Sequence, residues 1–413
     1  MLYPGLLLFG LSLPLSKSAS TVLLGVLYLS AIVGALYSKE FRDDLARNCR
    51  QPLTAALALF SLVAYLGIIH TEKYADGFSV ANKFVSLPAI YVLVSVLLQS
   101  DRREDNGTRK AEFLLFSFLA GLTALNLIGL TSYLGLVGDV KYVVPLAPLR
   151  LHHIWFSNIN ALGLYTAASL LLFTRYGRST SGRVSLCSFL VLSTLCILLS
   201  TSRTAWFGVT LTAVTMSAVA IRRKKTILLV ALFAVLAFSA SYRFLPLVHD
   251  RTNLLVWDLA LFSVDDQASS SLGSRFIMWK AAFWMFKAHP VIGVGTGDFV
   301  PTMTALRWAF ILPEFLLQYN QPHNMYLFAM ATNGIIGLAA LLFIFYRSLR
   351  FVVPVVRSGV EGNCFAFLAM ATVVHFMIAG FMDSFFHIQI LRYAFAFILG
   401  ICIRSSVNSV RQT

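Results

Sequence analysis

The sequence contains few charged residues. Asp, Glu, Lys and Arg make up 12% of the 413 residues, whereas hydrophobic residues make up 58% and the mean hydropathy is +0.76. A soluble globular domain carries about 25% charged residues, so this composition excludes one. The apolar runs are continuous rather than alternating, which excludes a transmembrane β-barrel and predicts membrane-spanning helices.

Several catalytic and metal-binding signatures are also missing. The five cysteines are scattered and lie mostly in apolar runs, which predicts neither a disulfide framework nor a metal site. We find no Gly-x-Ser-x-Gly elbow, no His-Glu-x-x-His motif and no P-loop. No covalent nucleophile, ATP hydrolysis or cofactor is therefore expected. The first apolar run lacks a preceding basic region, so we interpret it as a span and not as a cleaved signal peptide.

What the sequence does contain is a series of apolar runs. A hydrocarbon core of about 30 Å needs roughly 20 apolar residues per helix. By this measure we predict an all-α polytopic membrane protein, with residues 1–413 forming one integral membrane domain. The twelve predicted spans are about 2–16, 20–37, 53–70, 81–99, 111–131, 154–174, 185–201, 204–221, 226–242, 325–346, 363–381 and 388–405.

The distribution of Lys and Arg predicts the orientation. Most of the 33 basic residues lie in alternate loops and in the tail after residue 404, including the run Arg222-Arg223-Lys224-Lys225. Basic loops mark the cytoplasmic side, so both termini are expected there. The net charge of +15 has the same explanation, and nucleic acid is not an expected partner.

Residues 243–324 form the one long segment that is too polar and irregular to cross a membrane. The orientation predicts that it is periplasmic, and its pattern predicts short helices. The aromatic stretch 276–289, with Lys280 and Lys287 on one face, is typical of an interfacial helix. Gly-Val-Gly-Thr-Gly-Asp (293–298) lacks the dinucleotide-binding spacing and indicates a turn. Asp265-Asp266 could bind a metal, but no His or Glu cluster accompanies them, and a solvated loop is the favoured interpretation.

Arg203 is a candidate anion-binding residue. It lies in Ser-Thr-Ser-Arg-Thr-Ala-Trp (200–206), the outer turn between two predicted spans. Thr201 or Ser202 is expected to cap the second span, which places Arg203 in its first turn. A cation there opposes the helix dipole unless an anion binds both, so the pattern indicates a phosphate site. A membrane-anchoring arginine is the alternative, although anchors favour the opposite side.

Two further candidates lie in the outer segment. Ser274 is predicted to cap a helix, so that Arg275 also opens one and binds an anion. His323, in Gln-Pro-His-Asn, comes just before a predicted span. A helix start favours the neutral ring, which can accept a proton near neutral pH. A lone histidine is usually structural, but its proximity to two anion-seeking arginines makes it the candidate base.

The motifs around these residues together resemble the O-antigen ligase and polymerase superfamily. They are Thr-Ser-Arg-Thr-Ala-Trp (201–206), Gly-Ser-Arg-Phe-x-Met-Trp (273–279), Pro-Val-Ile-Gly-Val-Gly-Thr-Gly-Asp-Phe (290–299) and Pro-His-Asn-Met-Tyr-Leu…Asn-Gly-Ile-Ile-Gly (322–337). The resemblance lies in the C-terminal half. It implies a Gram-negative inner-membrane enzyme with its site at the periplasmic face, which moves a glycan from undecaprenyl diphosphate to an acceptor without a metal.

The resemblance also implies roles for single residues. Arg203 and Arg275 would bind the diphosphate, His323 would act near the glycosidic bond, and Lys83 would be a further basic residue at the mouth of a span. Additional residues expected to line the same cavity are Asn324, Asp298, Asp383 and His387.

Three activities share this pattern: ligation to lipid A–core oligosaccharide, polymerisation of repeat units, and transfer to protein serine or threonine. The compact chain, with one outer segment and no added C-terminal domain, favours the ligase. A transporter of lipid-linked glycans is the alternative from another class. Such a protein needs ionisable residues deep within several spans, whereas the candidates here collect on one side.

Overall fold

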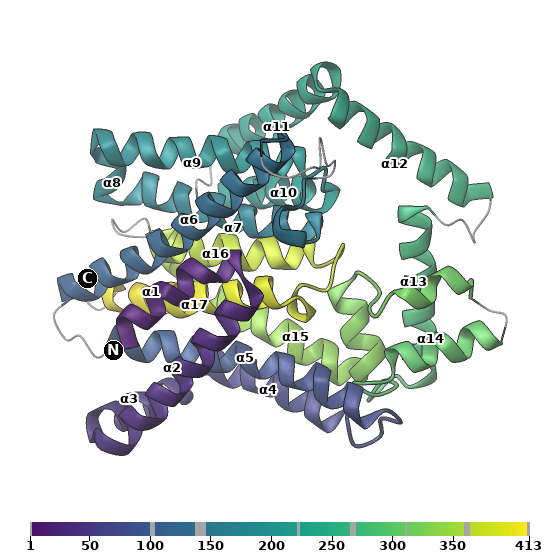
Figure 1. Ribbon diagram of the computed structural model, residues 1–413, viewed down its shortest axis with the longest axis horizontal. Coiled ribbons are helices and arrows are strands. Elements are labelled where there is room, and N and C mark those ends of the chain that lie inside the picture. Colours follow the sequence, from purple (N-terminus) through teal and green to yellow (C-terminus); the bar gives the residue numbers. More distant parts are fainter. Residues whose placement is uncertain are drawn as a thin grey trace.

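The computed structural model describes residues 2–99, 104–136, 146–220, 224–264, 270–309, 312–358 and 364–410. Within these ranges the chain is helical and contains no strand, which confirms the predicted all-α class. Long helices lie side by side in a bundle whose axis runs roughly horizontally in Figure 1. Lys141, Arg222, Arg223 and Asp265-Asp266 lie outside the described residues.

Each predicted span corresponds to one helix of the bundle. These helices are α1 (Leu2–Leu15), α2 (Lys17–Tyr37), α4 (Pro52–Leu66), α5 (Tyr74–Gln99), α6 (Glu104–Tyr133), α7 (His153–Phe173), α9 (Thr180–Leu199), α10 (Arg203–Ala220), α11 (Lys224–Phe244), α15 (Met325–Ser358), α16 (Cys364–Ala379) and α17 (Gln389–Val410). Among the described helices, six are long and apolar enough to cross a membrane, or seven if α3 (Lys39–Cys49) and α4, bent by 72°, form one span. The chain is thus a multi-pass membrane protein, while the count of twelve remains a prediction.

Burial divides the helices into inner and outer ones. α16 is apolar around its whole circumference and is buried along most of its length, as expected of a helix in the centre of a bundle. Phe376 of α16 packs against Phe395 of α17 with ring centroids 4.6 Å apart. In contrast, α2 exposes Val22, Leu29 and Leu36, which gives the outer surface the apolar character that lipid requires.

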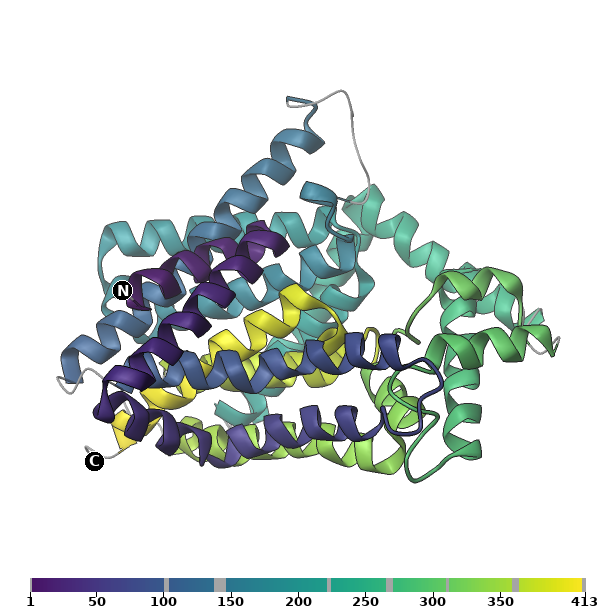
Figure 2. The ribbon, with the colours of Figure 1, turned by 60° about the horizontal axis from the view of Figure 1, so that its bottom comes forward.

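Residues 243–324 form α12 (Pro246–Val264), α13 (Ser271–Ala288), α14 (Phe299–Trp308) and the 3-10 turn η2 (Glu314–Gln318). Figures 1 and 2 show α13 and α14 at one end of the bundle, while α1 begins and α17 ends toward the other. α13 runs across the bundle axis rather than along it (Figure 1). The segment 243–324 thus contains helices, as predicted from the sequence. The periplasmic location of the segment remains a prediction.

α15 contains a kink that the glycine-rich motif supports. The backbone leaves helical geometry at Asn333 and Gly334, and Val294 N–H donates to the carbonyl of Ala331 at 2.9 Å. Gly293 (φ 71°) and Gly334 (φ 62°) both adopt left-handed conformations, and a Cβ on either would overlap backbone of the facing segment. The motif is a turn, as predicted, and it fits because two backbones approach closely.

Candidate functional site

His323 lies in the connection between η2 and α15, immediately before the cap of α15. Asn324 Oδ1 accepts hydrogen bonds from the N–H groups of Tyr326 and Leu327, each at 3.0 Å, and so caps the helix. The indole N–H of Trp279 on α13 donates to the carbonyl of Pro322 at 2.9 Å. α13 therefore fixes the backbone directly before His323.

The backbone of His323 is strained. Its φ is 50°, and within the described ranges only Leu149 and Thr201 are other non-glycine residues with positive φ. A non-glycine residue in this region costs about 1–3 kcal/mol, and such residues concentrate at functional sites. Thr201, which precedes the Arg203 helix, and His323 both border the same cavity.

Asp383 orients the His323 ring. It lies in the loop between α16 and the 3-10 turn η3 (Phe385–His387), and its Oδ1 is 3.0 Å from His323 Nδ1. An ionised carboxylate only accepts hydrogen bonds, so Nδ1 carries the proton and Nε2 is left as the proton acceptor. Gln321 Nε2 and the Ser384 N–H also donate to Asp383 Oδ1, at 3.0 and 2.8 Å.

The environment keeps Asp383 ionised although it is fully buried. Burial by itself would raise the pKa of Asp383, but the hydrogen bond and charge of His323 and the charge of Arg275 hold that pKa below its usual value. The carboxylate is thus available to bind the histidine proton at neutral pH.

His323 shares a cavity of about 300 Å³ with three arginines. The arginines come from three different helices: Arg203 from α10, Arg251 from α12 and Arg275 from α13. Other lining side chains include His152, His153, Ser202, Ser271, Ser274, Met278 and Tyr319. The tertiary structure thus brings together the two predicted anion-binding arginines and the candidate base.

Arg203 opens α10, as the sequence predicts. Ser202 caps the helix, because its Oγ accepts from the Ala205 N–H at 3.4 Å. Arg203 Nη2 lies 3.5 Å from Asp258 Oδ2 on α12, while Nη1 is buried and has no hydrogen-bond partner among the described residues. A half-buried guanidinium group with one buried, unused donor atom fits an anion at this position.

The predicted cap of the Arg275 helix is wrong. Ser270, not Ser274, caps α13, with its Oγ accepting from the Gly273 N–H at 3.0 Å. The helix therefore starts at Ser271, one turn earlier than expected, and Arg275 has no free helix N–H groups beside it. Arg275 still borders the cavity, where burial lowers its pKa and Asp383 opposes that effect.

Two histidines and one arginine of the cavity were not predicted as site residues. Burial lowers the pKa of His152 below its usual value, so this ring is neutral at pH 7. The positive charge of the cavity therefore comes from the three guanidinium groups. A signal for Arg251 exists in the sequence: Arg251 and Asp258 are seven residues apart, which places both on one face of a helix.

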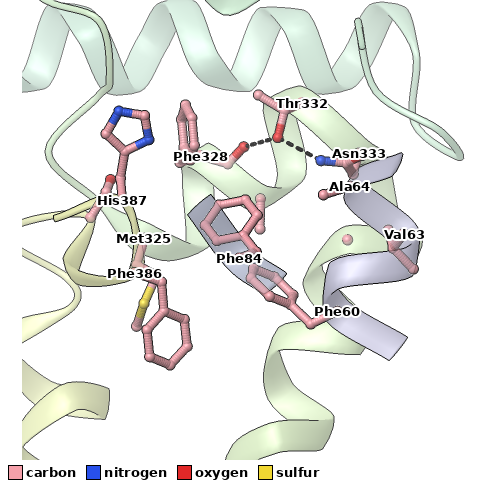
Figure 3. Close-up of a pocket in the computed structure, with 13 residues that line it drawn as sticks. Phe60, Val63, Ala64, Phe84, Met325, Phe328, Thr332, Asn333, Phe386 and His387 are labelled. Carbon is pink, nitrogen blue, oxygen red and sulfur yellow. Dashed lines mark hydrogen bonds between the residues drawn. The ribbon is translucent and has the colours of Figure 1, made fainter. Parts of the chain in front are cut away.

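Lys83 and His387 lie together but in a different place. Lys83 Nζ on α5 is 3.2 Å from His387 Nε2. His387 lines a separate cavity of about 20 Å³, with Phe60, Phe84 and Phe328 among its walls (Figure 3). This cavity is about the size of one water molecule. The pair thus connects α5 to the loop that carries Asp383 without facing the arginines.

Asp298 and Asn324 accept hydrogen bonds from backbone N–H groups, which account for their positions. Asp298 accepts hydrogen bonds from the N–H groups of Glu72 and Lys73, at 2.7 and 3.2 Å, and fixes the loop between α4 and α5. It also borders a second cavity of about 850 Å³ toward the C-terminal end of α13, together with Trp284 and His289. Neither Asp298 nor the cap residue Asn324 lines the cavity of His323.

The described residues contain no group of three or more His, Cys, Asp or Glu side chains that could hold a metal ion. The acidic pair Asp265-Asp266, considered above for this role, lies outside the described ranges.

Residues 188–342 match the model of a protein family described as O-antigen ligase. The predicted resemblance is confirmed over this segment. It contains Arg203, Arg251, Arg275 and His323, all four of which line the same cavity. Over this segment the chain is therefore similar to that family.

A curated relative extends the comparison without adding an activity. An uncharacterised protein of Haemophilus influenzae is 23% identical to the chain over 128 residues. The aligned part is 31% of this chain and 32% of the relative, so the match spans about a third of that protein.

Proposed function

We propose that the protein is an O-antigen ligase of the Gram-negative inner membrane. It transfers O-antigen polysaccharide from undecaprenyl diphosphate to a sugar hydroxyl of lipid A–core oligosaccharide at the periplasmic face. The observation that carries the proposal is the convergence of Arg203, Arg275 and His323 on one cavity, with Asp383 bound to the His323 ring. The family match over the same segment supports it.

The arginines supply the site for the leaving group. Arg203 and Arg275 bind the diphosphate, because guanidinium groups hold phosphate oxygens through paired, charge-assisted hydrogen bonds. The unused Nη1 donor of Arg203 is suited to this contact. Guanidinium groups held in place before the reaction stabilise the charge that develops on the diphosphate.

His323 acts as the general base. Its Nε2 takes the proton from the acceptor hydroxyl, whose oxygen attacks the anomeric carbon while the bond to the diphosphate oxygen breaks. The electron pair of that bond leaves with undecaprenyl diphosphate, and the proton passes from His323 to solvent. Asp383 keeps the ring in the required tautomer and stabilises the protonated form.

This is a single displacement, so it inverts the configuration at the anomeric carbon. It needs neither a nucleotide sugar nor a metal ion, since the lipid diphosphate is already activated. A product with retained configuration would contradict the mechanism.

A transfer assay with purified protein tests the proposal. The full chain in detergent receives undecaprenyl-diphosphate-linked glycan, lipid A–core and EDTA. His323→Ala and Arg275→Ala are compared with Arg243→Ala, which removes an exposed arginine outside the cavity. We expect glycan on lipid A–core with the wild type and the control, and its loss in both cavity variants.

The other outcomes separate the alternatives. Longer glycans that remain on the carrier lipid would indicate a polymerase, and glycan attached only to serine or threonine of an added protein would indicate a protein O-oligosaccharyltransferase. No transfer to any acceptor, combined with movement of the carrier lipid across vesicle membranes, would indicate a transporter.

A further inference from the structure

α12 presents one polar face to the cavity. Arg251 and Asp258 are separated by seven residues, or about two helical turns, and therefore point to the same side of the helix. Three apolar side chains on other faces of the helix are exposed: Leu254, Val256 and Trp257 have relative exposures of 47%, 62% and 65%. Arg251 borders the cavity of His323, and Asp258 is buried against Arg203.

The charges on this face are not balanced. Asp258 Oδ2 lies 3.5 Å from Arg203 Nη2, and the same carboxylate lies in the field of Arg251. Burial and the neighbouring charge of Arg203 lower the pKa of Arg251, while Asp258 opposes them. One carboxylate thus lies near two guanidinium groups, and Arg275, whose charge Asp383 partly offsets, adds a third guanidinium group to the cavity. Such an arrangement attracts an anion of high charge.

The reaction proposed above produces an anion of that kind. A diphosphate joined at one end to a lipid and at the other to a sugar carries two negative charges. When the glycosidic bond breaks, the diphosphate keeps only the lipid ester and carries three. The third charge appears in the transition state, so a group that binds it accelerates the step without tightening the binding of the substrate.

We propose that Arg251 is the residue that binds this third charge. Arg203 and Arg275 hold the diphosphate in both states, whereas Arg251 distinguishes the trianionic leaving group from the dianionic ester. The inference rests on the proposed function and adds to it a catalytic residue and a preference between two charge states of the same ligand. Asp258 positions Arg203 and moderates the repulsion between the two guanidinium groups.

Direct binding measurements test this preference. The first probe is farnesyl diphosphate, which is a trianion at pH 8. The second is farnesyl diphosphate with a single methyl ester on its terminal phosphate, which is a dianion. Their affinities for the full chain in detergent are measured by isothermal titration calorimetry. For the wild type we expect tighter binding of the trianion. In Arg251→Gln we expect the ratio of trianion affinity to dianion affinity to fall about tenfold, while the affinity for the dianion stays nearly unchanged.

Two variants serve as comparisons. Arg243→Gln makes the same charge change at an exposed position outside the cavity and should keep the wild-type preference. Arg251→Lys retains the charge and should keep part of the preference for the trianion. The ratio of the two affinities is internally controlled, because a misfolded protein loses both ligands together. In transfer assays Arg251→Gln should lower kcat and leave KM for the lipid-linked glycan nearly unchanged.

The results also separate this inference from the proposed function. An Arg251→Gln protein that keeps the wild-type preference overturns the role of Arg251, while the diphosphate site stands if Arg275→Gln weakens both probes. If the wild type binds neither probe, or if Arg275→Gln binds both as tightly as the wild type, the diphosphate site itself is wrong and the role of Arg251 falls with it.

Discussion

The Nδ1 atom of His323 and the Oδ1 atom of Asp383 are 3.0 Å apart, although the two residues are separated by 60 positions in the chain. The contact joins the loop before α15 to the loop after α16. A backbone hydrogen bond, from the Met325 N–H to the carbonyl of Gly380 at 2.8 Å, also holds this region together. The candidate base is therefore aligned by two loops that meet only in the folded bundle.

Replacing Asp383 by Asn should reduce catalysis strongly. The amide group of Asn can donate to Nδ1, which would turn the ring to the tautomer that has its proton on Nε2. We expect kcat for glycan transfer to fall by a factor of about 10² or more. Asp250→Asn, at a side chain that is 74% exposed, is the matched control and should retain activity. Wild-type kcat in Asp383→Asn would remove Asp383 from the mechanism.

Trp279→Phe should impair the position of His323 while leaving the arginines in place. The substitution keeps an aromatic ring but deletes the N–H that donates to Pro322. The lost bond is worth about 1 kcal/mol, so we expect kcat to fall about fivefold to tenfold with little change in diphosphate affinity. Trp308→Phe, at a 73% exposed side chain, is the control. Equal losses in both variants would contradict a specific role for Trp279.

Gly334→Ala should destabilise the protein. A Cβ at this position would overlap the backbone of Val291 and Ile292, and the left-handed φ of 62° disfavours any residue with a side chain. We expect a loss of about 1–3 kcal/mol, seen as a fall of several degrees in Tm in detergent. Gly25→Ala on α2 has open space around the new Cβ and should leave Tm nearly unchanged. Similar values of Tm for the two variants would argue against the close crossing of backbones.

Local patterns in the sequence accounted for much of this protein. Continuous apolar runs determine the helices, because in a membrane every backbone polar group must be satisfied within the segment. The order of Ser202 and Arg203 fixed the start of α10, and Pro-His-Asn-Met fixed the start of α15 through the Asn324 cap. These features depend on neighbours within one or two turns, so they can be predicted from the sequence.

Only the tertiary structure decided which polar groups share the cavity. From the sequence, Asp383, Asp298 and His387 were all expected to line the cavity. In the structure Asp383 contacts His323. Asp298 instead binds the N–H groups of Glu72 and Lys73. Arg251 borders the cavity together with Arg203, whose side chain lies 3.5 Å from Asp258 on the same helix as Arg251, and this long-range contact cannot be predicted from the sequence. Arg203, Arg275 and His323 were identified from the sequence, whereas Arg251 was not. Their partners depend on long-range packing of the helices, which brings together groups up to hundreds of residues apart.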